Sequence, residues 1–203
     1  MLTPESRREI EAAFAAAQGK TRAPLQCVLA QTSADYALLP VLAAAALALA
    51  APWPLLWLTS LAPERVYLIQ LALFALLLAG IAWTPIRVAL ATSAHKRSAG
   101  HRAALTQFAL RGLDRAPERN GVLLYVSLGE RYARIVADVG FDGKAPASQW
   151  RAAIDELAAA MKRGEREAAL KSAAARLGDA LAQHYPAPPG GPTPKGEGFH
   201  VVH

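Results

Sequence analysis

Few side chains in this sequence combine the types and spacing that chemistry needs. The candidate metal ligands are Asp114, Asp138 and Asp142, which fall near the expected ends of strands and helices. Oxygen ligands there could converge on a hard cation such as calcium or magnesium. No Asp-rich loop surrounds them, and residues 139–141 put apolar bulk between Asp138 and Asp142. Solvated carboxylates are the simpler interpretation, so we expect no cofactor, with a divalent cation as the alternative.

The other reactive side chains are equally scattered. Ser127 has no sequence context that marks a nucleophile, and Glu130 with Arg131 either shapes a turn or offers an exposed contact site. The single cysteine, Cys27, lies in an apolar run and is expected to be a small core residue. Five histidines have no partner at metal-ligand spacing: His95, His101, His184, His200 and His203. Catalytic residues are therefore unassigned, and a function without catalysis is favoured.

Two long uncharged stretches dominate the chain. Residues 36–63 contain no charged side chain over 28 positions, and residues 66–86 contain none over 21. Because a helix rises about 1.5 Å per residue, about 20 apolar residues cross a hydrocarbon core of about 30 Å. We predict transmembrane helices over residues 36–61 and 66–86, with the prolines after Ala51 kinking or shortening the first. A cleaved signal sequence is disfavoured, because its n-region would contain a helix and a strand.

The charge distribution predicts how this hairpin is oriented. The formal net charge is +6, and residues 87–119 alone hold seven basic and two acidic side chains. The short turn between the spans offers only Arg65 as a cation. The positive-inside rule then puts both ends of the hairpin in the cytoplasm. Basic residues after the second span either lie against the anionic leaflet or are solvated surface, and their position needs no nucleic acid partner.

The flanking segments predict a small folded domain. We expect a helix that begins at Pro4, with Thr3 as its N-cap, and ends at Gly19. A strand over residues 25–31 and a helix over residues 98–111 are also expected. Two β-rich runs, residues 122–128 and 132–139, are separated by a turn containing glycine and predict a hairpin. The first run is apolar on both faces and should be central in its sheet.

Two further helices and a tail complete the chain. The stripe Trp150, Ile154, Leu157 and Met161 has helical spacing, and a second helix runs up to Tyr185. Residues 187–203 begin with closely spaced prolines and glycines, and we predict that this tail is disordered.

Several of these segments resemble the TPM domain family. The most specific is the run Arg119–Ser127, RNGVLLYVS, with Glu130-Arg131 after it. The opening Leu2-Thr3-Pro4-Glu5 resembles that family too. The Trp150 helix, the break at Gly164 and the closing His184-Tyr185-Pro186 are similar to its membrane-bound bacterial branch. The resemblance implies an α/β fold, a small α/β/α sandwich with a mixed sheet. Some TPM-domain proteins are described as phosphatases or as binders of divalent metals.

The predicted organisation follows from the hairpin and the resemblance together. Residues 1–35 supply a helix and strand, residues 95–186 supply the remainder of the domain, and the hairpin is inserted between the first strand and the following helix. We expect a multi-pass protein of the bacterial inner membrane, with termini and domain cytoplasmic. Its partners would be lipid, through residues 36–86, and another membrane protein or a second copy. The leading hypothesis is an interaction or assembly module, and the alternative is a metal-dependent phosphatase-like hydrolase.

Overall fold

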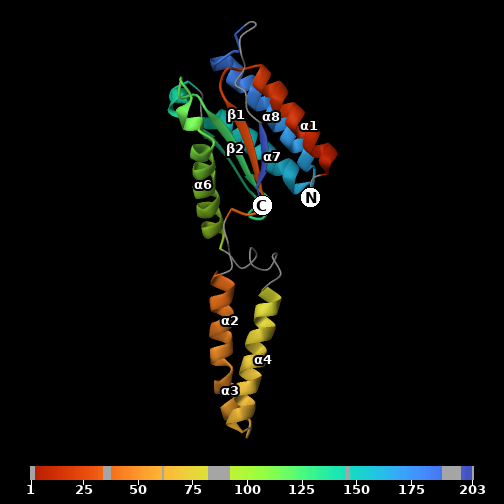
Figure 1. The fold of residues 1–203 in the computed structure, drawn as a ribbon, viewed down its shortest axis with the longest axis vertical. Coiled ribbons are helices and arrows are strands. Elements are labelled where there is room, and N and C mark those ends of the chain that lie inside the picture. Colours follow the sequence, from red (N-terminus) through yellow and green to blue (C-terminus); the bar gives the residue numbers. More distant parts are fainter. Residues whose placement is uncertain are drawn as a thin grey trace. The chain divides into compact units, whose positions relative to one another are not determined.

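The chain divides into two compact units. The computed structural model describes residues 3–33, 38–60, 62–81, 92–144, 147–188 and 198–202 (Figure 1). The first unit comprises Met1–Ser33 and Arg97–His203, and the second comprises Ala34–Lys96.

A four-stranded mixed sheet forms the centre of the first unit. Its order is β3-β2-β1-β4, with β1 at Leu25–Ala30, β2 at Val122–Ser127, β3 at Tyr132–Ala137 and β4 at Phe199–Val202. β1 pairs in parallel with β2 and β4, while β2 and β3 form an antiparallel pair. All six residues of β2 are buried. This confirms the prediction that the strand apolar on both faces is central.

Helices cover both faces of this sheet. α1 (Pro4–Gly19), α7 (Ala147–Lys162) and α8 (Arg166–His184) lie on one face, and α6 (Ser93–Leu110) lies on the other (Figure 1). Alternate strand residues feed two cores, as the period of two requires. The α1/α8 core includes Cys27 and Leu124, and the α6 core includes Val28 and Leu123.

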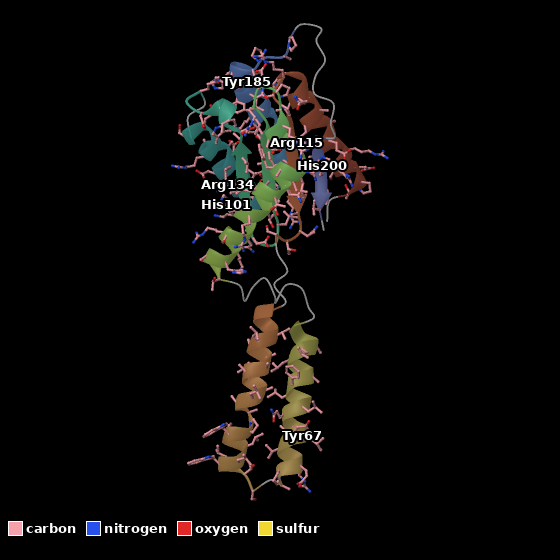
Figure 2. All side chains as sticks on the ribbon, turned by 60° about the vertical axis from the view of Figure 1, so that its left-hand side comes forward. Tyr67, His101, Arg115, Arg134, Tyr185 and His200 are labelled. Carbon is pink, nitrogen blue, oxygen red and sulfur yellow. The ribbon has the colours of Figure 1, made fainter. Side chains whose placement is uncertain are left out.

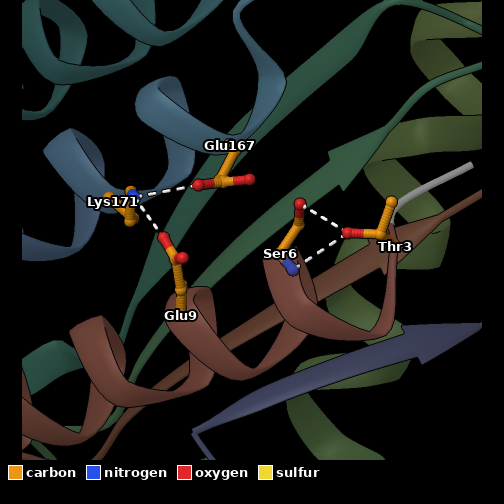
Figure 3. Close-up of polar contacts among 5 residues, drawn as sticks. All are labelled: Thr3, Ser6, Glu9, Glu167 and Lys171. Atoms are coloured by element: carbon orange, nitrogen blue, oxygen red, sulfur yellow. Dashed lines mark hydrogen bonds and ion pairs between the residues drawn. The ribbon is translucent and has the colours of Figure 1, made fainter.

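α1 begins where the sequence predicts. The Thr3 hydroxyl accepts a hydrogen bond from the Ser6 amide at 3.1 Å. Pro4 occupies the first turn, where a backbone amide would have no carbonyl acceptor within the helix, so the missing N–H of proline costs nothing. Figure 3 shows how α1 meets α8: the Lys171 ammonium donates to Glu9 at 2.7 Å and to Glu167 at 2.9 Å. Hydrogen bonds from the Ser6 hydroxyl and from Lys171 lower the pKa of Glu167 to about 2.

α6 packs closely on the sheet because its inner face is small. Ala99, Gly100 and Ala104 are buried there together with Phe108. A Cβ at Gly100 would lie 2.5 Å from the ring of Tyr132, so only glycine permits this approach. The helix starts at Ser93, five residues earlier than predicted, because the polar residues that precede Ser98 continue it.

The second unit consists of apolar helices. α2 spans Leu38–Ala50, α3 spans Pro52–Leu58 and α4 spans Pro63–Ile81. α2 and α3 are separated at Ala51, where Pro52 and Pro54 follow in the sequence. α2 packs against α4, and the small residues Ala44 and Ala48 are buried one turn apart. The predicted span ends at residues 36–37, 61 and 82–86 lie outside the described residues.

The prediction of a disordered tail is wrong for residues 198–202. These residues form β4 and its approach, and Phe199 is buried in register with Cys27. The Phe199 ring stacks on Phe14 with centroids 6.2 Å apart, and the Cys27 amide donates to the Gly198 carbonyl at 2.7 Å. The prolines that predict disorder lie before this short apolar strand, which gains its stability from burial and pairing rather than from its own length.

Phe199→Ala should therefore expose β1. Removing a buried phenylalanine ring costs about 3 kcal/mol, which corresponds to a roughly hundredfold increase in opening. Burial raises the pKa of the Cys27 thiol and protects it, so the labelling rate of this single cysteine in the full chain in mild detergent measures the opening. Leu110→Ala, at an exposed position of α6, is the control and should label at the parent rate. Equal rates for both variants would contradict a holding role for β4.

Candidate functional site

The described part of the second unit carries an extensive apolar surface. Two stretches, Val41–Leu58 and Pro63–Gly80, are each 18 residues long and apolar enough to cross a membrane, and at most 11% of either stretch is buried. Tyr67 of α4 is labelled in Figure 2. The exposed large apolar side chains are Leu42, Leu47, Leu49, Trp53, Leu56, Trp57 and Leu58 on α2 and α3, and Tyr67, Leu68, Ile69, Leu71 and Leu76 on α4. Helix pairing leaves this surface uncovered.

A buried polar cluster joins the ends of β1 and β2 in the first unit. The Glu130 carboxylate accepts hydrogen bonds from the Ser33 amide at 2.7 Å, from the Ser33 hydroxyl at 3.3 Å and from the Ser127 hydroxyl. The Tyr125 hydroxyl donates to the Ser33 hydroxyl at 3.0 Å, and burial raises the pKa of this phenol. Each carboxylate oxygen is satisfied within the fold. The cluster therefore fixes the β2–β3 turn to the last residues before the second unit.

Asp138 forms an ion pair at the other end of the β2–β3 hairpin. Arg119 donates from Nε to Oδ2 at 2.7 Å and from Nη2 to Oδ1 at 2.9 Å, and the Val139 amide donates to Oδ1 at 2.8 Å. These hydrogen bonds, that from Arg119 foremost, lower the pKa of the buried Asp138 carboxyl. Asp138 also caps the short 3₁₀ helix Val139–Phe141. This carboxylate is fully engaged in holding the hairpin.

The structure does not bring the three predicted carboxylates together as a metal site. Asp114 lies in the 3₁₀ helix Leu113–Arg115, where its Oδ1 is buried without a hydrogen-bond partner among the described residues. Asp142 is exposed at the end of the second 3₁₀ helix. In the described part of the chain, no group of three or more His, Cys, Asp or Glu side chains could hold a metal ion.

The Arg119-Asn120-Gly121 run has a structural explanation. Arg119 adopts a positive φ of 52°, and its carbonyl accepts from the Gly140 amide at 2.8 Å. A Cβ at Gly121 would lie 2.3 Å from the Leu113 carbonyl oxygen, which explains the glycine. The closing Tyr185 is structural as well, since its hydroxyl donates to the Gly140 carbonyl at 2.6 Å. Figure 2 places Tyr185 at the far end of this unit from His101.

A pocket of about 290 Å³ lies within the first unit, at the carboxyl ends of β1 and β4. Arg7 of α1 and Arg166 of α8 contribute its two charged side chains, and no lining residue is acidic. The first turns of both helices border the pocket, so the positive N-terminal ends of the two helix dipoles add to its positive potential. The remaining lining is mainly apolar: Thr3, Pro4, Leu29, Gln31, Leu128, Met161, Leu170 and Val201. Its chemistry suits a group that is both apolar and anionic.

Sequence reasoning missed most of these placements. Ser33 and Tyr125 join the Glu130 cluster only because β1 and β2 pair in parallel, which brings their carboxyl ends to one edge. The interpretation of Glu130 as a residue that shapes the turn agrees with its contacts, whereas Ser127 gains a role as its donor. Arg7 and Arg166 are 159 positions apart in sequence, and only the α1–α8 packing places them on one pocket.

Asp138→Asn should destabilise the first unit in a pH-dependent way. Loss of the charged hydrogen bonds to a buried carboxylate costs about 2 kcal/mol at neutral pH. Because the folded pKa is below the unfolded value of about 3.9, this stabilisation is present above pH 4 and is lost as pH falls through the folded pKa. Denaturant unfolding of both proteins from pH 7 to pH 2.5 should show the difference shrinking. A difference that stays constant with pH would contradict the ion-pair explanation.

Comparison with known proteins supports the fold and the resemblance. Residues 84–180 match the family model described as the TPM domain. The solution NMR structure of the BA42 protein from the psychrophilic bacterium Bizionia argentinensis is similar in fold, with a TM-score of 0.61 and 15% identity over 100% of this chain and 96% of that one. No curated protein matches the chain. The segment from residue 84 to residue 180 is thus TPM-like, and β1, β4 and α1 complete its sheet and core from outside the matched region.

Proposed function

We propose that this protein is a membrane-anchored TPM-like module that binds or assembles other membrane proteins from the cytoplasmic face. The observation that carries the proposal is the exposed apolar surface of α2, α3 and α4. Each exposed leucine or tryptophan there leaves about 2 kcal/mol of burial energy unused in water. A hydrocarbon core of about 30 Å matches the roughly 27 Å rise of an 18-residue helix and would cover this surface.

The basic residues support a cytoplasmic orientation. Residues 87–119 carry a net charge of +5, whereas the α3–α4 connection and the start of α4 carry Glu64 and Arg65. Both ends of the apolar segment lead into one folded unit, so an even number of crossings is required. Two crossings with the basic side inside satisfy both conditions. A location in the bacterial inner membrane is therefore part of the proposal.

An interaction function agrees with how the polar groups are used. The Glu130 and Asp138 carboxylates are bound by the protein's own donors, and the described residues supply no group that favours the hydrolase alternative. The Arg7/Arg166 pocket is a surface where a partner could bind: Arg7 is paired with Glu11, whereas Arg166 forms no ion pair with the described residues. Its positive rim and apolar lining suit a segment of a membrane protein that carries an acidic residue beside apolar ones.

Leu76→Arg tests the anchor. Leu76 is 72% exposed on α4, so arginine should be harmless in water but cost about 3 kcal/mol near the centre of a bilayer. The matched control is Leu110→Arg on α6, at a position 74% exposed. We expect the parent and the control to stay in the membrane pellet after alkaline carbonate washing, while Leu76→Arg shifts toward the soluble or degraded fraction. A parent protein that washes off would refute the anchor.

Arg166→Glu tests the interaction pocket. A photo-reactive amino acid at Leu128, which lines the pocket, should cross-link to a neighbouring membrane protein in intact membranes. Reversing the charge of Arg166 should reduce that product at least tenfold, because an acidic segment would then be repelled. Lys162→Glu makes the same charge change on an exposed residue outside the pocket lining and should leave the yield unchanged. Equal yields for all three proteins would refute the pocket as the contact surface.

A further inference from the structure

α6 carries an unusual excess of positive charge. The helix Ser93–Leu110 contains Lys96, Arg97 and Arg102 and no acidic residue. Arg97 and Arg102 are exposed and Lys96 is partly exposed. Among the residues that the structure describes, these three cations form no ion pair, whereas seven other cations do: Arg7, Lys20, Arg22, Arg119, Arg163, Lys171 and Arg176. Within the described part of the chain, no carboxylate therefore balances the charge of these three side chains.

The position of these cations conflicts with the helix dipole. Lys96 and Arg97 lie in the first two turns of α6, where the unpaired amides already produce positive potential. The Thr92 hydroxyl accepts from the His95 amide at 3.3 Å and satisfies only part of this end. A cation here is unfavourable unless an anion lies beside it. The sequence thus places charge against local helix preference, which indicates a functional reason.

The packing of α6 leaves these cations available to an external surface. The inner face begins at Ala99, so Lys96 and Arg97 precede the first residue buried against the sheet. Arg102 lies on the exposed side with Leu105, which is 45% exposed one turn later. The three cations extend over about 9 Å of helix axis. This combination of cations with an exposed leucine suits the boundary between lipid headgroups and acyl chains.

The connection between α4 and α6 is short in sequence. α4 ends at Ile81 and α6 begins at Ser93, so eleven residues connect them. An extended chain of that length reaches at most about 40 Å. Because the cytoplasmic leaflet of a membrane is anionic, cations within a Debye length of about 8 Å are attracted to it.

We propose that Lys96, Arg97 and Arg102 form a binding site for the phosphate groups of anionic lipid headgroups. The site rests on the proposed anchor, because α6 meets the leaflet only if α4 ends in the membrane. It adds a lipid preference to the protein, which the apolar helices alone do not provide. Each cation near an anionic surface strengthens binding about fivefold.

The test uses the full chain in nanodiscs of phosphatidylcholine with phosphatidylglycerol as the minor component. Native mass spectrometry counts the lipids that stay bound to the protein. The parent should retain phosphatidylglycerol at least about fivefold above its share of the bilayer, and Lys96→Gln/Arg97→Gln/Arg102→Gln should return the ratio to that of the bilayer. Arg8→Gln/Arg151→Gln/Lys162→Gln removes the same charge from exposed positions outside α6 and should keep the enrichment.

Each other outcome overturns a defined statement. A parent that does not enter nanodiscs refutes the anchor and this site together. A parent that enters without enrichment, or whose enrichment survives in the α6 variant, refutes the lipid site alone. Equal losses in both variants assign the effect to net charge rather than to α6. Tighter binding of single-stranded RNA than of phosphatidylglycerol would assign the cations to nucleic acid. The Cys27 labelling rate should match the parent in both variants and verifies that each has folded.

Discussion

The parallel pairing of β1 with β2 is the constraint on which the rest of the molecule depends. Leu25 pairs with Val122 and Ala30 with Ser127, so partners in the ladder are 97 positions apart in sequence. Folding must close this long loop before either strand can gain from burial, and parallel pairs form no tight turn of their own. The apolar helices lie inside that loop. A membrane that holds both their ends on one side would shorten the search for this pairing.

Polar contacts at the two ends of the β2–β3 hairpin secure the closure. Glu130 binds Ser33 at one end, and Arg119 binds Asp138 at the other. Several residues that give the chain its resemblance to the TPM domain make these contacts or pack closely beside them. Arg119, Gly121 and Tyr185 each have a partner or a close approach that explains their identity. Such motifs mark the fold, and they do not by themselves mark a reaction.

The sequence predicted those parts of the fold that local patterns determine. Both strands of the hairpin and the central position of β2 follow from runs of apolar residues, and α1 follows from Thr3 and Pro4. β4 could not be predicted, because its four residues gain order only from the groove beside β1 and Phe14. The same holds for the candidate site. Arg7 and Arg166, or Ser33 and Glu130, meet through tertiary packing that no spacing in the chain encodes.

The two faces of the sheet differ in how they use charge, and this difference suits a module with two kinds of neighbour. On the α1/α8 face several cations are paired with carboxylates, as Lys171 is with Glu9 and Glu167. Arg166 lines the pocket and forms no ion pair with the residues that the structure describes. On the α6 face the cations precede the buried segment and have no acidic neighbour on their helix. A cation that already pairs with a carboxylate of its own protein gains little from an anionic partner. An unpaired cation attracts such a partner without first breaking an internal ion pair. Arg166 and the α6 cations are therefore the two places at which we propose anionic neighbours, one bound by a pocket of defined shape and one by a row of cations on a helix.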